Sequence, residues 1–61
     1  MPIVTMDILK GRTVEQKRNM VHKVTDVLVE TLNCTPEAVQ IIIHEIEPIH
    51  IAKGGILQSD K

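Results

Sequence analysis

The chain has 61 residues, a formal net charge of −1 and no Phe, Tyr or Trp. Nucleic-acid binding usually needs a basic face, often with stacking aromatic side chains, so the composition argues against a nucleic-acid partner. No apolar run approaches the ~18 residues of a membrane span, and the first residues lack the basic and apolar regions of a signal peptide. We therefore expect a cytoplasmic protein with no membrane partner.

The length predicts a single domain, residues 1–61, which would bury only ~60% of the surface of its unfolded chain. Small domains usually gain further stability from disulfides, a metal or partner subunits. Cys34 is the only cysteine, so no internal disulfide can form. The histidines His22, His44 and His50 lack the close spacing of a metal site, so we expect no metal. Self-association is then the expected source of stability.

The first predicted element is a strand at Pro2–Leu9, where β-branched residues alternate loosely. A proline at the first residue of a strand removes no hydrogen bond that the sheet needs. If Met1 is cleaved, this proline becomes a free secondary amine at the chain terminus, and such an amine can act as a base. A turn is predicted next at Lys10–Arg12, where Gly11 can adopt a positive φ.

A helix is predicted from about Val14 to Leu32, ending near Asn33. Thr13 and Gln16 have the spacing of a capping box at its start. Apolar residues recur at the helical period and form one stripe, with charged residues on the other side. The stripe contains Met20, Val21, Val24, Val27, Leu28 and Leu32.

The second half of the chain begins with a short helical turn at Thr35–Glu37, signalled by a proline after a capping residue. The isoleucine-rich run that follows favours a strand at Val39–Ile46. The pair Gly54-Gly55 predicts a hairpin turn between short strands at His50–Ala52 and Ile56–Gln58. Strand, helix and strand form a β-α-β unit, whose strands are normally parallel. The expected class is α+β, a small β-α-β protomer with a C-terminal hairpin.

A two-stranded sheet with one helix leaves one face and both edges uncovered. The consecutive isoleucines at 41–43 cannot all be buried by one helix. Another subunit usually covers exposed edges and apolar faces of this kind. The residues themselves therefore predict a second copy of the chain as a partner.

The sequence resembles the 4-oxalocrotonate tautomerase family in "MPIV" at the start, "GRTVEQKRN" after the first strand and the Gly-Gly pair near the C-terminus. The resemblance covers nearly the whole chain. It implies dimers with a four-stranded sheet, and three dimers in a homohexamer. It also implies a cofactor-independent isomerase, in which an amino-terminal proline moves a proton between the enol and keto forms of a 2-hydroxydienoate or 2-oxo acid.

By position, the resemblance implies that Pro2 is the catalytic base and that Arg12 binds the substrate carboxylate at a neighbouring subunit's site. The chain departs from the family at two expected substrate-binding positions. Gln40 stands where characterised members carry a second arginine, and Ile51 stands where they carry an aromatic wall residue. The glutamine points to a substrate with one carboxylate rather than two.

The chemistry fits the residues. Ketonisation needs a base that is partly unprotonated at neutral pH, and a proline amine is normally too basic. An apolar surrounding from Ile3, Ile51 and Ile56 would favour the neutral amine, as would the positive charge of Arg12.

Two alternatives stay open. A non-catalytic or only promiscuously active oligomer of the same fold is compatible with Gln40 in place of an arginine. A strand followed by two helices also describes ribbon-helix-helix repressors, whose strands enter the DNA major groove. Against a repressor, the first strand presents Thr5 and Asp7 and contains no Arg or Lys, and the segment that would form the second helix, 38–46, is rich in isoleucine.

Overall fold

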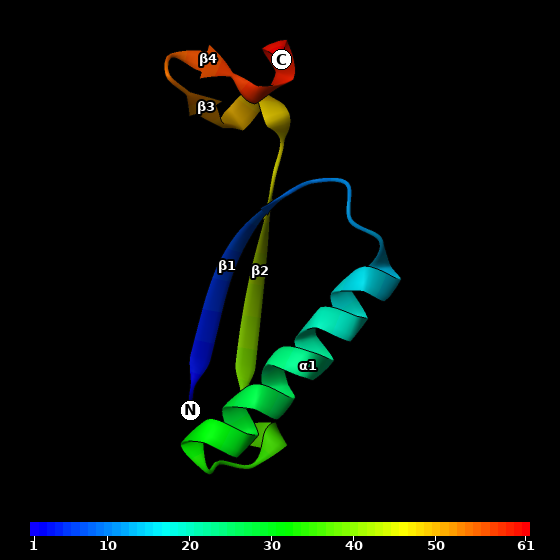
Figure 1. The fold of residues 1–61 in the computed structure, drawn as a ribbon, viewed down its shortest axis with the longest axis vertical. Coiled ribbons are helices and arrows are strands. Elements are labelled where there is room, and N and C mark those ends of the chain that lie inside the picture. The colour runs from blue at the N-terminus through cyan, green and yellow to red at the C-terminus, as the bar shows by residue number, and fades with distance from the viewer.

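The computed structural model describes the whole chain, residues 1–61, and has two small sheets and one long helix. Strand β1 (Ile3–Leu9) leads into helix α1 (Val14–Leu32), and strand β2 (Gln40–Ile46) returns parallel to β1 (Figure 1). Strands β3 (Ala52–Lys53) and β4 (Ile56–Leu57) form an antiparallel hairpin. Short 3₁₀ helices lie at Pro36–Ala38, Pro48–His50 and Gln58–Asp60. The predicted α+β class, with a β-α-β unit and a C-terminal hairpin, is confirmed.

Local signals set the ends of α1. The Thr13 N–H donates to Gln16 Oε1 at 2.9 Å, and the Gln16 N–H donates to Thr13 Oγ1 at 3.1 Å, which completes the predicted capping box. At the other end Asn33 adopts the left-handed conformation, with φ of 54°. The predicted bounds of the helix are therefore confirmed.

The two long strands pair from Ile3 opposite Gln40 to Leu9 opposite Ile46. Both begin one residue later than predicted. Before β2, the Val39 N–H donates to the Pro36 carbonyl at 3.1 Å and so closes a 3₁₀ turn instead of joining the sheet. Residues 40–46 are strand, so the second helix of a ribbon-helix-helix fold is absent and that alternative is wrong.

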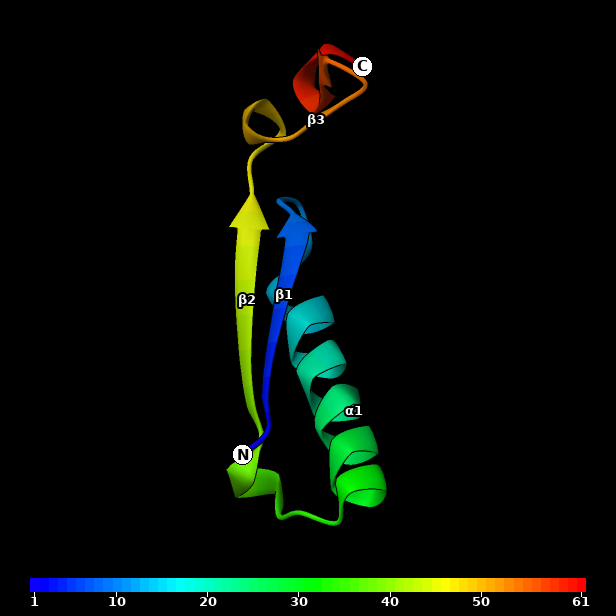
Figure 2. The ribbon, with the colours of Figure 1, turned by 90° about the vertical axis from the view of Figure 1, so that its left-hand side faces the viewer.

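Helix α1 covers one face of the β1–β2 sheet and leaves the other face open (Figure 2). Side chains alternate between the two faces along each strand. The face toward α1 is half-buried and carries Val4, Met6, Ile8, Ile41 and Ile43. The open face carries Ile3, Thr5, Asp7, Leu9, Ile42 and His44, all exposed.

The hairpin turns at Gly54 and Gly55, whose φ values of 60° and 80° are the pair of positive values that such a turn requires. Its strands are shorter than predicted, because two expected strand residues lie in 3₁₀ turns. The His50 N–H donates to the Glu47 carbonyl at 2.8 Å, which closes one turn, and Gln58 begins the other.

The single chain has no closed core, since none of its 61 residues is buried. On the open face, Ile3 is 49% exposed and Ile42 is 46% exposed. The radius of gyration is 14.7 Å, against about 10.5 Å for a compact chain of this length. The excess arises because the hairpin extends beyond the end of β2, away from α1 (Figure 1). None of the helices combines the length and the apolar character that a bilayer crossing requires.

Candidate active site

Pro2 and Gln40 lie together at the N-terminal end of the β1–β2 sheet. The Gln40 N–H donates to the Pro2 carbonyl at 3.0 Å, and Gln40 is opposite Ile3 in the register. Pro2 is half-buried, whereas Met1 and Gln40 are exposed. With Met1 in place the Pro2 nitrogen is a tertiary amide, and removal of that one residue would make it a secondary amine.

Arg12 lies at the opposite end of β1, in the turn before α1. The seven residues of β1 separate it from Pro2 by about 20 Å. None of the five ion pairs of the chain includes Arg12, so its guanidinium fork is free to bind an anion. A single chain therefore does not bring Arg12 to its own Pro2.

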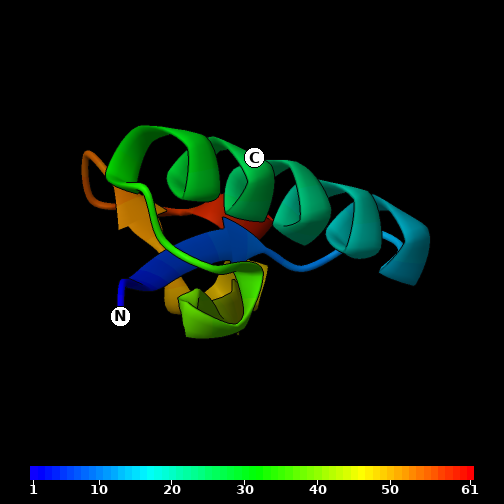
Figure 3. The same cartoon turned by 90° about the horizontal axis from the view of Figure 1, so that it is seen from below.

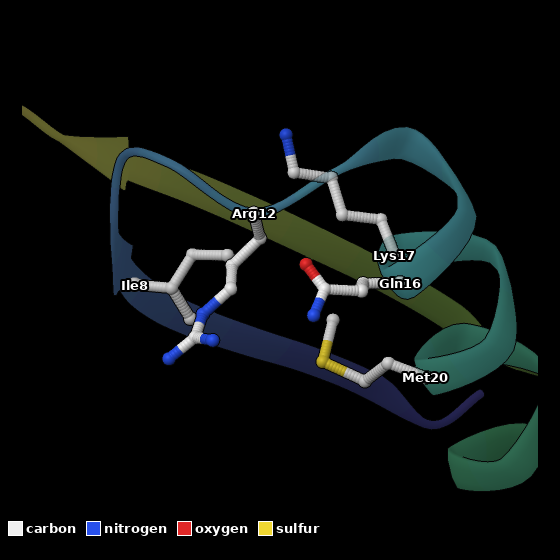
Figure 4. A pocket seen from close by; sticks show the side chains of 5 residues that line it. All are labelled: Ile8, Arg12, Gln16, Lys17 and Met20. Carbon is white, nitrogen blue, oxygen red and sulfur yellow. The ribbon is translucent and has the colours of Figure 1, made fainter.

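A pocket of about 140 Å³ opens beside Arg12, between the end of β1 and the first turns of α1. Its lining residues are Ile8, Arg12, Gln16, Lys17 and Met20. Figure 4 shows the Arg12 and Gln16 side chains lying near Ile8 and Met20, whereas the Lys17 amine points away from the other four. The pocket thus combines apolar surface with polar hydrogen-bond donors, which suits the carboxylate end of a small apolar acid.

The Lys17 amine is paired with a carboxylate of β2. Lys17 Nζ lies 2.6 Å from Glu45 Oε2, and the two side chains are 25% and 38% exposed. The pair leaves Arg12 as the only unpaired cation in the pocket lining.

Ile51 lies between the second 3₁₀ turn and β3, far from Pro2. The hairpin and the N-terminus are at opposite ends of the molecule (Figure 1). The Ile51 carbonyl accepts a hydrogen bond from the Gln58 N–H at 2.9 Å, and its side chain is exposed. Ile51 can therefore form a wall near a proline only if that proline belongs to another copy of the chain.

Two further side-chain contacts, one between the strands and one just beyond their ends, were not predicted from the sequence. Viewed from below, the sheet has α1 on one side (Figure 3), and on the other side His44 Nδ1 lies 3.2 Å from Asp7 Oδ1. At the far end of the sheet, Lys10 Nζ lies 3.0 Å from Glu47 Oε1. The hydrogen bond to Glu47, and then its charge, raise the pKa of the Lys10 amine above its ordinary value. Neither pair lines the pocket beside Arg12.

Comparison with known proteins identifies the family of this chain. Residues 2–61 match the family model described as tautomerase enzyme. The 2-hydroxymuconate tautomerase of Bacillus subtilis is 45% identical over 60 residues, which are 98% of this chain and 97% of that protein.

Solved structures give the same result. A 4-oxalocrotonate tautomerase isozyme from Methylibium petroleiphilum is 42% identical with a TM-score of 0.90, over 97% of this chain and 92% of that one. A subunit of the heterohexameric 4-oxalocrotonate tautomerase from Chloroflexus aurantiacus is 27% identical with a TM-score of 0.89, over 98% of this chain and 97% of that one. The chain belongs to the tautomerase family of enzymes.

Proposed function

We propose that this protein is an enol–keto tautomerase for a 2-hydroxydienoate or a related 2-oxo acid, with the Pro2 amine as general base and acid. The observation that carries the proposal is the position of Pro2, where loss of Met1 creates a secondary amine on a half-buried strand end. The amine takes the proton from the enol oxygen, the oxygen becomes a carbonyl as the double bonds shift, and the ammonium returns a proton to carbon. The steps balance without a cofactor.

The site draws its residues from more than one copy. Pro2 and Arg12 lie about 20 Å apart along β1, so a site that contains both takes them from two chains. Gln40 lies beside Pro2, and its amide would contact the substrate there. Ile51, at the other end of the molecule, would supply an apolar wall from a neighbouring copy.

Self-association is supported by the surface of the single chain. The open sheet face, both sheet edges and the extended hairpin are exposed in the single chain, in which no residue is buried. Surfaces of this kind are usually covered by another subunit. A dimer with a four-stranded sheet would pair edges, and three dimers in a hexamer would cover the remaining apolar surface. The relative from Chloroflexus aurantiacus is a heterohexamer.

The direct test is ketonisation of a 2-hydroxydienoate, followed by the loss of its ultraviolet absorbance. Protein whose intact mass shows that Met1 is absent should accelerate the reaction well above the rate in buffer. The chain has no Phe, Tyr or Trp, so its own absorbance near 280 nm is minimal. If processed, oligomeric protein gives no acceleration, the enzyme proposal is wrong and the non-catalytic oligomer is favoured.

We further expect a substrate with one carboxylate, because Gln40 has no charge. Glutamine offers a neutral NH2 group and an acceptor oxygen, whereas arginine can bind a carboxylate with two charge-assisted hydrogen bonds. Hydrogen bonds to charged groups contribute ~1.5–3 kcal/mol and neutral ones roughly 0.5–1.5 kcal/mol. Gln40→Arg should therefore raise kcat/KM for a dicarboxylate enol about tenfold, and more than for a monocarboxylate enol.

The pH profile gives a second measurement of the same change. A new cation near the Pro2 amine favours the unprotonated amine, so the activity of Gln40→Arg should begin to rise at lower pH than that of the unmodified protein. Gln40→Met, which removes the polar group without adding charge, is the control. Equal gains on both substrates would show that residue 40 does not contact a distal carboxylate.

A further inference from the structure

We infer that Glu45 is a positioning residue that sets the charge preference of the Arg12 pocket by holding the Lys17 ammonium away from it. The inference rests on the proposed function, because it concerns which carboxylate substrates that pocket accepts. Glu45 does not line the pocket and acts only through the lysine.

The position of Glu45 follows from the register of the sheet. Glu45 is directly opposite Ile8, which lines the pocket, and it lies on the sheet face that α1 covers. From there its carboxylate reaches Lys17 Nζ at 2.6 Å. Both side chains are only partly exposed, so solvent screens this pair less than a fully exposed one. The lysine stem lines the pocket, while its amine points away from the other lining side chains (Figure 4) and is paired with Glu45 of β2.

The ion pair decides how many free positive charges the pocket presents. With Lys17 neutralised by Glu45, the Arg12 guanidinium is the single free cation and can match one carboxylate. Without the Glu45 charge, the flexible four-carbon stem of Lys17 lets its ammonium turn back toward the pocket. A ligand with a second carboxylate would then gain a partner, whereas a monocarboxylate would gain little.

Glu45→Gln removes the charge and keeps the shape of the side chain. It should raise the dicarboxylate-to-monocarboxylate ratio of kcat/KM about tenfold, through a lower KM for the dicarboxylate with kcat little changed. High salt should reduce the gain, because the added attraction is screened. Binding of adipate and of hexanoate, measured by calorimetry, should show the same change in ratio without any turnover.

The chain supplies a matched control. Lys10 and Glu47 form a second lysine–glutamate pair outside the pocket, and Glu47→Gln changes the net charge by the same amount. This control should leave the ratio unchanged. The double variant Lys17→Met with Glu45→Gln should return the ratio to that of the unmodified protein. Lys17→Met alone leaves the Glu45 carboxylate without its partner beside the pocket, so it should lower the ratio. This variant keeps the test available if Glu45→Gln does not fold.

Several results would overturn the inference. The first two are an unchanged ratio in Glu45→Gln and an equal rise in Glu47→Gln. The other two are a raised ratio that persists in the double variant and a ratio that does not fall in Lys17→Met alone. If the unmodified protein ketonises enols, these results leave the proposed function standing. If it ketonises neither class of enol, the proposed function fails, while the adipate and hexanoate measurements still decide the role of Glu45.

Discussion

Pro2→Ala in the processed chain should lower kcat/KM for enol ketonisation about 10²- to 10⁴-fold, the range of a positioned general acid–base. The alanine amine is primary and lacks the ring that holds the proline nitrogen, so it is a poorer base in a poorer position. Stopped-flow absorbance on a 2-hydroxydienoate measures the loss. The variant's mass and oligomeric state should match those of the unmodified protein, which separates lost chemistry from lost assembly.

Retention of Met1 tests the same amine without changing any side chain of the site. Met1 is 77% exposed, so an aminopeptidase can reach it in the folded chain. While it is attached, the Pro2 nitrogen has no usable lone pair, and such a preparation should be as inactive as Pro2→Ala or more so. Pro2 would be ruled out as the base if a preparation whose intact mass shows that Met1 is present ketonised enols as fast as protein without Met1.

Mixing two inactive variants should restore activity, because the proposed site takes Pro2 and Arg12 from different copies. Pro2→Ala and Arg12→Ala subunits, refolded together in equal amounts, should recover about one quarter of the native sites, since each native residue is present at random in half of the subunits. The physical reason is the separation of about 20 Å along β1 within one chain.

The control for this experiment is the double variant Pro2→Ala with Arg12→Ala, refolded with the Pro2→Ala subunit. That mixture contains no native Pro2 and should stay inactive. Sedimentation should show oligomers in every sample, and mass spectrometry should show that the subunits mix. Mixed oligomers of the two single variants with no activity would mean that both residues act from the same copy, contrary to the proposed site.

Much of the fold could be predicted because its signals are local. Thr13 and Gln16 are three residues apart and make their capping bonds within one helical turn, and Asn33 ends the helix by its own backbone conformation. The positive φ values at Gly54-Gly55 likewise follow from residue type. The predicted ends of the strands were less accurate than those of the helix. The reason is that 3₁₀ turns next to prolines compete with the sheet for the same N–H groups, as at Val39.

The candidate site was only partly predictable, because its contacts join residues far apart in the sequence. Lys17 and Glu45 are separated by 28 positions, and their ion pair depends on how α1 lies across the sheet. No residue spacing indicates that contact. The roles expected for Pro2 and Arg12 came from the family resemblance, and they stay predictions. The structure adds that the two lie at opposite ends of one strand.

The lack of any buried residue in the single chain affects how the protein folds in the cell. If the core closes only between copies, folding becomes a second-order process, and its rate falls as fewer chains are synthesised. A newly made chain that waits for partners exposes apolar strands to chaperones and proteases. Weak expression would then lower the amount of active enzyme more than proportionally, so that promoter strength would control abundance and folding yield together.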